Sequence, residues 1–155
     1  MNILIAEDNA FTSKQYKTVL EKNGHTVFLT KNGLECIDEY VNEAQYAELF
    51  RKDKSPPYDL VLLDHDMPIK KGAEVAKEIL ARRPNQRILF LSAYGQGILD
   101  NIKELKDDTV EIIQKPFSLG FLLRKVEGKL ISNRVIYGEQ NGKPLSVTQD
   151  PAAIR

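Results

Sequence analysis

The sequence predicts an α/β fold in which a five-stranded parallel sheet is covered by helices on both faces. Short apolar runs alternate with segments of helical spacing, a pattern typical of repeated strand–helix units. Polar residues stand at the ends of four of these runs, namely Glu7-Asp8, Asp64, Ser92 and, after Gln114, Lys115. In a parallel sheet the carboxyl ends of all strands lie at one edge, where open α/β folds bind their ligands. We therefore expect these polar residues to meet at that edge.

The composition excludes several classes of protein. A chain of 155 residues fits one domain that can bury a core. Its 22 Lys and Arg balance 22 Asp and Glu, so no basic field favours direct contact with nucleic acid. No stretch approaches the ~18 apolar residues of a membrane span, and no secretory signal is visible at the N-terminus. The single cysteine, Cys36, cannot form an internal disulfide, which suits a cytoplasmic location.

Two strand–helix units open the chain. A strand over 3–6 precedes a helix over about 10–23, and Gly24 supplies a left-handed stop to that helix. A second strand over 26–30 then leads through the turn residues Asn32-Gly33 into another helix.

The second helix is predicted to be long. Apolar residues recur every three or four positions, so the stripe can run to about Lys52. Its members are Leu34, Ile37, Val41, Ala44, Ala47 and Phe50. Ser55-Pro56-Pro57 ends this segment, and we expect the helix to project past the sheet. A loose loop over 45–57 is the alternative.

Three further units complete the pattern. Strands are predicted over 60–63, 88–91 and 110–113, each followed by a helix, and Pro84 ends the first of these helices. The last helix is expected over 118–131, with its serine as N-cap. The inward positions of the first two helices are Val75, Ala76, Ile79 and Leu80, then Ile98, Ile102 and Leu105.

Three carboxylates at the predicted sheet edge indicate a metal site. Two like charges ~4 Å apart repel by ~4 kcal/mol at an effective dielectric constant of 20, so Glu7, Asp8 and Asp64 require a cation if they converge. Mg²⁺ prefers oxygen ligands and pairs with phosphate. The alternative is that Glu7 and Asp8 merely cap the first helix. Together with Ser92 and Lys115, the acids favour a Mg²⁺-assisted phosphoryl site with Asp64 as the acceptor.

Four strings in order resemble the response-regulator receiver domain of two-component signalling, of the chemotaxis type. They are AEDN at 6–9, LVLLDHDMP at 60–68, FLSA at 90–93 and QKPFS at 114–118. The resemblance covers roughly residues 1–131. It implies a flavodoxin-like, doubly wound sheet of order 2-1-3-4-5. It also implies phosphorylation by a histidine kinase or phosphotransfer protein, and relay of a conformational change to an unknown downstream protein.

The same resemblance implies a set of metal ligands. Asp8 and Asp64 would coordinate Mg²⁺ directly, and Glu7 would act mainly through water. The backbone carbonyl of Asp66 would complete the protein ligands.

The resemblance also assigns roles in phosphoryl transfer. Asp64 would be the nucleophile and become an acyl phosphate. Mg²⁺, the Lys115 ammonium and the Ser92 hydroxyl would each neutralise one oxygen of the phosphoryl group. The Lys115-Pro116 peptide bond is expected to be cis.

Two features depart from the family pattern. Asp66 is an acid two residues after the phosphoacceptor, and with Tyr94 it should tune water access and the lifetime of the phosphoryl group. Ile112 stands where relatives often carry an aromatic residue that switches position. We therefore expect the signal to depend on movement of residues 92–98.

The chain divides into a receiver domain over 1–132 and a C-terminal tail or linker over 133–155. Within the tail, Asn141-Gly142 is a hairpin turn signal, with apolar triplets at 135–137 and 145–147 on either side. A disordered tail or the start of a linker is nevertheless the more ordinary interpretation of this segment. The 23 residues of the tail are too few for a common DNA-binding module.

Two other functions are weighed against the receiver. Asp64-x-Asp66, followed by a serine and a lysine after later strands, also resembles the haloacid-dehalogenase phosphatases, but those carry their acidic pair late in the chain rather than at Glu7-Asp8. The other alternative is a non-phosphorylated scaffold that keeps the fold. We predict a signalling domain rather than a turnover enzyme. A homodimer is open, because receivers often pair through the face formed by the fourth helix, fifth strand and fifth helix.

Overall fold

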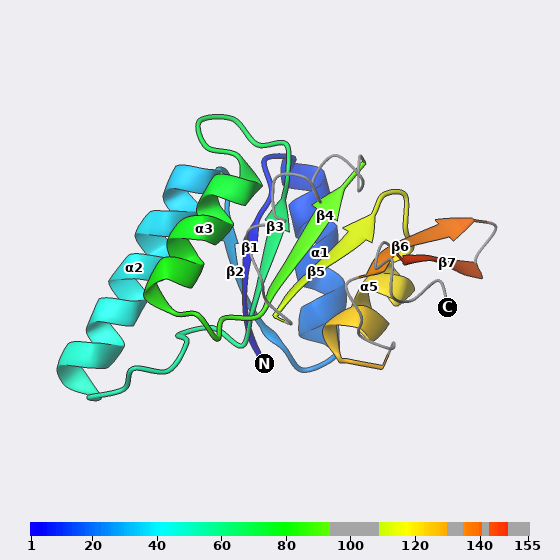
Figure 1. The fold of residues 1–155 in the computed structure, drawn as a ribbon. Helices are drawn as coiled ribbons and strands as arrows, with labels where there is room; N and C mark the ends of the chain where they lie inside the picture. The colour runs from blue at the N-terminus through cyan, green and yellow to red at the C-terminus, as the bar shows by residue number, and fades with distance from the viewer. Residues whose placement is uncertain (94–108, 130–134, 141–142, 149–155) are drawn as a thin grey trace.

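The structure is a computed structural model and describes residues 1–93, 109–129, 135–140 and 143–148. Its centre is a sheet of seven strands in the order β2-β1-β3-β4-β5-β6-β7 (Figure 1). The strands are β1 (Asn2–Ala6), β2 (Thr26–Thr30), β3 (Leu60–Asp64), β4 (Ile88–Ser92), β5 (Val110–Gln114), β6 (Val135–Gln140) and β7 (Lys143–Thr148). The first five are parallel, and their predicted order 2-1-3-4-5 is confirmed.

Helices cover both faces of the sheet. They are α1 (Ala10–Lys22), α2 (Gly33–Phe50), α3 (Gly72–Arg82) and α5 (Leu119–Val126). Helices α2 and α3 lie on one face, and α1 and α5 lie on the other (Figure 1). The predicted helix carrying Ile98, Ile102 and Leu105 falls outside the described residues.

Alternating side chains of each strand build two cores, one on either side of the sheet. Leu4, Val61 and Phe90 point toward α2 and α3, whereas Ile3 and Leu62 point toward α1 and α5. All five side chains are fully buried. Strands buried on both faces are therefore continuous apolar runs, as the sequence shows.

The predicted length of the second helix is confirmed, but its predicted inward stripe is partly wrong. Helix α2 has 18 residues and ends at Phe50. The alternative of a loose loop over 45–57 is therefore wrong for residues 45–50. Leu34 and Phe50 were expected to face inward, yet both are exposed. The buried face consists of Gly33, Cys36, Ile37, Tyr40, Ala44 and Ala47. Phe50 has no core to enter because the end of α2 extends beyond the sheet (Figure 1).

The C-terminal segment forms the hairpin that its turn signal predicts, and this hairpin extends the five predicted strands to seven. Strands β6 and β7 pair antiparallel, from Val135↔Thr148 to Gln140↔Lys143. The turn residues themselves lie outside the described residues. Strand β6 joins β5 in parallel over Ile112↔Ile136 and Ile113↔Tyr137. The expectation of a disordered tail or linker is therefore wrong for the two strands.

Candidate functional site

The predicted site residues follow the carboxyl ends of four neighbouring strands. Asp64 is the last residue of β3 and Ser92 the last of β4, while Glu7 follows β1 and Lys115 follows β5. Register aligns these ends, because Asp64 pairs with Leu91 and the Lys115 N–H donates to the Ser92 carbonyl at 2.7 Å. The parallel sheet thus brings the four strand ends to one edge.

Three carboxylates meet at this edge, as predicted. One oxygen from each of Glu7, Asp8 and Asp64 lies within 4.8 Å of the others. Glu7 and Asp64 are 4% and 7% exposed, so water screens their mutual repulsion poorly. Oε2 of Glu7 is buried without a hydrogen-bond partner. A cluster of carboxylate oxygens with one unsatisfied atom fits a hard divalent cation such as Mg²⁺.

The pKa values of two acids in the cluster are raised. Burial is the main cause for Glu7, and the Asp64 carboxylate raises its pKa further. Burial also raises the pKa of Asp64; the Lys115 ammonium opposes this rise, and Asp8 adds to it. Both shifts mean that the folded chain holds these carboxylates less readily in their charged form.

Lys115 supplies the positive charge of the site. Its Nζ lies 3.5 Å from Oδ1 of Asp64 and 3.7 Å from Oε2 of Glu7. The Lys115-Pro116 peptide bond is cis, which confirms the prediction. The next two residues fix the chain that follows, because Phe117 stacks on Tyr16 and Ser118 caps α5 by accepting from the Phe121 N–H at 3.0 Å.

The alternative role for the first two acids, capping α1, is wrong. Asn9 is the N-cap, and its side chain accepts from the Thr12 N–H at 2.9 Å. The Asn9 N–H in turn donates to Oε1 of Glu7 at 3.1 Å. One residue therefore both starts α1 and holds the Glu7 carboxylate in the cluster.

The remaining predicted residues are placed as follows. Ser92 is 1% exposed at the end of β4. Asp66 has an exposed side chain, and its backbone N–H donates to the Asp64 carboxylate, which partly opposes the rise in the pKa of Asp64 that burial causes. Tyr94 and most of the 92–98 segment lie outside the described residues.

Comparison with known proteins decides the family. The family model of the response regulator receiver domain matches residues 3–127. The chain belongs to the response-regulator receiver family. Chemotaxis protein CheY of Bacillus subtilis is 34% identical to it over 83% of this chain and 96% of CheY.

Two further similarities define the range of receiver proteins that the chain resembles. A Borrelia burgdorferi structure of a CheX-CheY complex with BeF₃ and Mg²⁺ has a TM-score of 0.68 and 26% identity, and covers 84% of this chain and 90% of that one. A hybrid signal transduction histidine kinase of Dictyostelium discoideum is 26% identical over 98% of this chain. The chain spans only 8% of that kinase. Receiver sequences thus occur in proteins of very different size.

Two residues of this receiver support the site without having been singled out for it. A Cβ on Gly72 would lie 2.6 Å from the carbonyl oxygen of Asp64, so only glycine lets α3 start so close to the phosphoacceptor. Tyr16 of α1 is buried near the acids; burial mainly raises its pKa, and the charges of Glu7 and Asp64 add to the shift. A glycine at the start of a helix after the aspartate loop was the available signal for Gly72.

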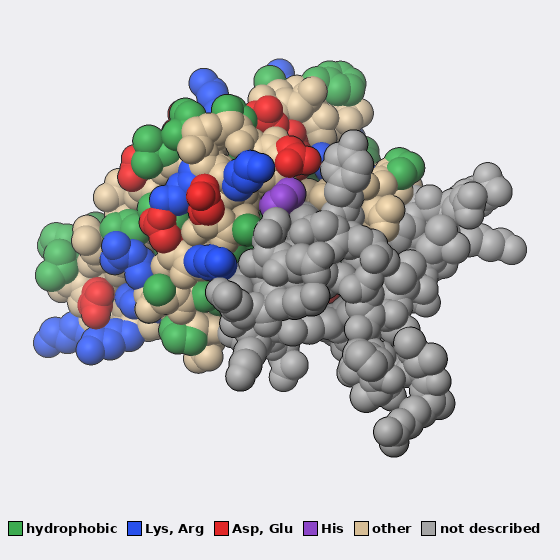
Figure 2. Space-filling model, turned by 45° about the horizontal axis from the view of Figure 1, so that its top comes forward, with side chains coloured by type: hydrophobic (Ala, Val, Ile, Leu, Met, Phe, Trp, Pro, Cys, Tyr) green, Lys and Arg blue, Asp and Glu red, His purple; other side chains and the backbone are tan. Residues whose placement is uncertain are grey.

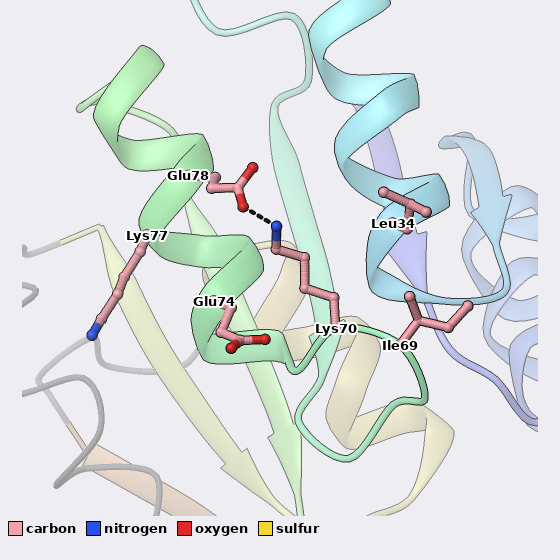
Figure 3. Close-up of a pocket in the computed structure, with 6 residues that line it drawn as sticks. All are labelled: Leu34, Ile69, Lys70, Glu74, Lys77 and Glu78. Atoms are coloured by element: carbon pink, nitrogen blue, oxygen red, sulfur yellow. Dashed lines mark hydrogen bonds and ion pairs between the residues drawn. The ribbon is translucent and has the colours of Figure 1, made fainter.

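A separate hollow lies on the α2–α3 side of the receiver (Figure 3). It has a volume of about 460 Å³, and Leu34, Ile69, Lys70, Glu74, Lys77 and Glu78 line it. Lys70 forms an ion pair with Glu78, and Lys77 points away from the hollow in Figure 3. Gly33 lets α2 begin against the Lys70 carbonyl, where a Cβ would be only 2.4 Å away. This hollow is a shallow surface feature beside the loop that follows Asp64.

Among the helices that the structure describes, none is long and apolar enough to cross a membrane.

Proposed function

We propose that the chain is phosphorylated on Asp64 by a histidine kinase or phosphotransfer protein, in a reaction that requires Mg²⁺. The observation that carries this proposal is the placement of Asp64 among two other acids, with the Lys115 ammonium 3.5 Å from its carboxylate. A nucleophilic carboxylate, a cation site and a fixed positive charge are the parts that phosphoryl transfer needs.

The residues of the site divide the tasks of phosphoryl transfer among them. An oxygen of Asp64 attacks the phosphorus, the bond to the donor histidine nitrogen breaks, and an acyl phosphate forms on Asp64. Lys115 and the Ser92 hydroxyl bind oxygens of the transferred group and offset its charge. Asp8, Asp64 and the Asp66 carbonyl would hold Mg²⁺ directly and Glu7 mainly through water, and the bound ion would supply further positive charge to the phosphoryl oxygens. Attack of water on the acyl phosphate releases phosphate and restores the carboxylate.

The proposal describes a signalling domain and not a turnover enzyme. An acidic pair at Glu7-Asp8, early in the chain, distinguishes it from the haloacid-dehalogenase arrangement. A receiver-fold scaffold without phosphorylation would have no use for the buried, like-charged Glu7 and Asp64, whose repulsion disfavours the metal-free fold.

Partners and location follow from the same proposal. The phosphoryl donor is a histidine kinase or phosphotransfer protein, and the signal passes to an unknown downstream protein rather than to nucleic acid or a membrane. We also propose a cytoplasmic location, which suits a chain whose single cysteine, Cys36, is free and buried.

Uptake of phosphate from acetyl phosphate tests the proposal. The wild-type chain should gain one phosphoryl group in the presence of Mg²⁺ and none after chelation. Asp64→Asn should gain none, because the amide has lost the nucleophilic oxygen. Asp38→Asn is the matched control, since it removes an exposed acid on α2 outside the site and should leave uptake intact. Equal uptake by the Asp64→Asn variant would refute the assignment of the phosphoacceptor.

A further inference from the structure

An apolar patch stands at the far end of α2. Tyr46, Leu49 and Phe50 are 52%, 74% and 73% exposed on the last two turns of this helix. These turns extend beyond the sheet (Figure 1), and hydrophobic and basic side chains gather at the same end of the molecule in Figure 2. We call these three side chains the α2 patch. Their spacing of three and four residues puts them on one face of the helix.

The α2 patch is ordered before any partner arrives. The rings of Tyr46 and Phe50 are 4.9 Å apart. The Arg51 guanidinium lies 5.5 Å from the centre of the Tyr46 ring, and it donates to Glu43 at 2.8 Å. Contacts that already fix aromatic side chains reduce the entropy lost on association. Exposed aromatic side chains grouped in this way mark an interaction surface.

Charge is strongly segregated around the α2 patch. Every charged residue within α2 is acidic: Glu35, Asp38, Glu39, Glu43 and Glu48. The segment directly after the helix is mostly basic, with Arg51, Lys52 and Lys54 against Asp53. The apolar patch therefore has acids on its N-terminal side and bases on its C-terminal side. Such a surface complements itself when a second copy is turned end to end.

We propose that the α2 patch is the surface through which two copies of this chain associate, with the two α2 ends packed antiparallel about a two-fold axis. The patch of one copy covers the patch of the other. Glu43 and Lys52 lie on opposite sides of the patch centre, each about four or five residues, or roughly 6–8 Å, away from it. A two-fold axis through that centre therefore places Lys52 and Lys54 of one copy opposite Glu43 of the other. A parallel arrangement would instead oppose acid to acid. An isologous contact of this kind closes after two copies.

The size of the α2 patch sets the strength of this pairing. Three side chains of this size expose on the order of 400 Å², about half the ~800 Å² that each partner contributes to a stable interface. The dimer is therefore weak and depends on concentration.

The α2 patch is remote from the phosphorylation site, so the pairing does not require phosphorylation. Helix α2 starts beside the loop after β3, where Gly33 contacts Lys70, and it runs away from that edge. Its 18 residues place Phe50 about 25 Å along the helix axis from Gly33. Association through this end leaves the carboxyl edge of the sheet open.

Sedimentation velocity from micromolar to millimolar protein tests the proposal. The wild-type chain should shift reversibly from monomer to dimer, with and without acetyl phosphate and Mg²⁺. The double variant Leu49→Ser, Phe50→Ser should bind itself at least about tenfold more weakly, the effect expected on truncating central apolar anchors. Phe11→Ser is the matched control, because Phe11 is 72% exposed on α1 but lies outside the patch. A wild-type chain that stays monomeric, or a patch variant that associates as well as wild type, would overturn the proposal.

Charge reversal tests the antiparallel arrangement without replacing any apolar side chain of the α2 patch. Lys52→Glu with Lys54→Glu, and separately Glu43→Lys, should each weaken self-association. These changes fall on the surface and leave the core intact, and unchanged circular dichroism would verify this. Mixing the two variants should restore a dimer, because each then meets the opposite charge. If the mixture associates no better than either variant alone, the antiparallel pairing is wrong.

Discussion

At the scale of single residues, the site combines buried acids that repel one another with one lysine that partly compensates them. Polar residues at strand ends were sufficient to predict that the acids and Lys115 meet and that Ser92 ends the neighbouring strand, because a parallel sheet aligns its strand ends by construction. The role of Gly72 could not be predicted in the same way. The need for glycine there arises from the distance between α3 and the Asp64 backbone, which is a property of packing and leaves no periodic signal.

The raised pKa values of Glu7 and Asp64 predict a pH dependence of stability in the absence of metal. A carboxyl group with a raised pKa in the folded state contributes stability that is present below its unfolded pKa and is lost as the pH rises through its folded pKa. Asp64→Asn removes one of the charges and should stabilise the metal-free chain at pH 7 by about 1 kcal/mol, well within the ~4 kcal/mol of a like-charge pair at 4 Å.

This gain should shrink toward acidic pH, where the carboxyls of the wild-type chain are protonated. Urea unfolding of both chains between pH 4 and pH 7, in the presence of a chelator, measures the difference. Mg²⁺ should raise the stability of the wild-type chain more than that of the variant. A variant less stable than wild type at pH 7 would contradict the prediction.

At the scale of elements, the length of α2 was predictable, but that of α5 was not, because the last helix was expected to reach position 131 and ends at Val126. Helix orientation was only partly predictable. The apolar spacing of α2 gave its length, but Cys36 and Tyr40 are buried where Leu34 and Phe50 were expected. Tyr40 is retained in the core because its hydroxyl donates to Gln86 at 2.8 Å, a partner that no pattern within α2 reveals. A stripe defined by apolar residues alone misses polar-tipped side chains with buried partners.

A buried ion pair fixes α5 to the sheet. Lys125 of α5 and Glu111 of β5 are 1% and 5% exposed and form an ion pair, and Arg87 lies 3.6 Å from the same carboxylate. Lys125→Met should destabilise the chain by roughly 3–5 kcal/mol, because it leaves a buried carboxylate with less compensation. Adding Glu111→Leu should recover most of that loss, since no buried carboxylate is then left to compensate. Denaturant unfolding of the single and double variants measures both steps. A double variant as unstable as the single one would show that the pair itself is required.

The C-terminal hairpin protects the edge of the sheet. Gln140 and Lys143 pair across a two-residue connection, as the hydrogen-bonded pair of such a turn does. Hydrogen-bonded and non-hydrogen-bonded pairs alternate along an antiparallel ladder, so the backbone N–H position of residue 144 faces away from β6, toward the open edge of the sheet. Proline at that position offers no N–H to another strand.

Truncation after Ser132 should leave phosphorylation intact but uncover β5 and increase association. Light scattering and acetyl phosphate uptake test these two outcomes, and unchanged association would reduce the segment to a linker.

At the scale of the whole molecule, the phosphorylation site and the α2 patch occupy opposite ends of α2. The order 2-1-3-4-5 was predictable through resemblance to the receiver family, whereas the attachment of β6 to β5 was not. The pairing of β6 with β5 covers only two residue pairs, and a parallel partner distant in sequence leaves no local pattern. Local sequence signals therefore indicated the hairpin itself but not its pairing with β5 in the sheet.

The pairing of β6 with β5 also affects how the phosphorylation signal is transmitted from the site. Ile112 is 3% exposed, packs in the α2–α3 core and pairs with Ile136 of β6. Its β-branched side chain has a stiff χ1 angle, so Ile112 should move little on phosphorylation. Residues 92–98 should move instead. Amide shifts in the chain with and without beryllofluoride and Mg²⁺ measure this, and large shifts at Ile112 with small shifts at 92–98 would contradict it.

Chemical trapping of the phosphorylated residue tests the central claim most directly. The chain is incubated with acetyl phosphate and Mg²⁺, reduced with borohydride, which converts an aspartyl phosphate to homoserine, and mapped by peptide mass spectrometry. We predict homoserine at position 64 alone, and none when Mg²⁺ is chelated. Trapping at Asp8 or Asp66 with Asp64 unmodified, or modification of Asp64 that is equal without Mg²⁺, would contradict the account.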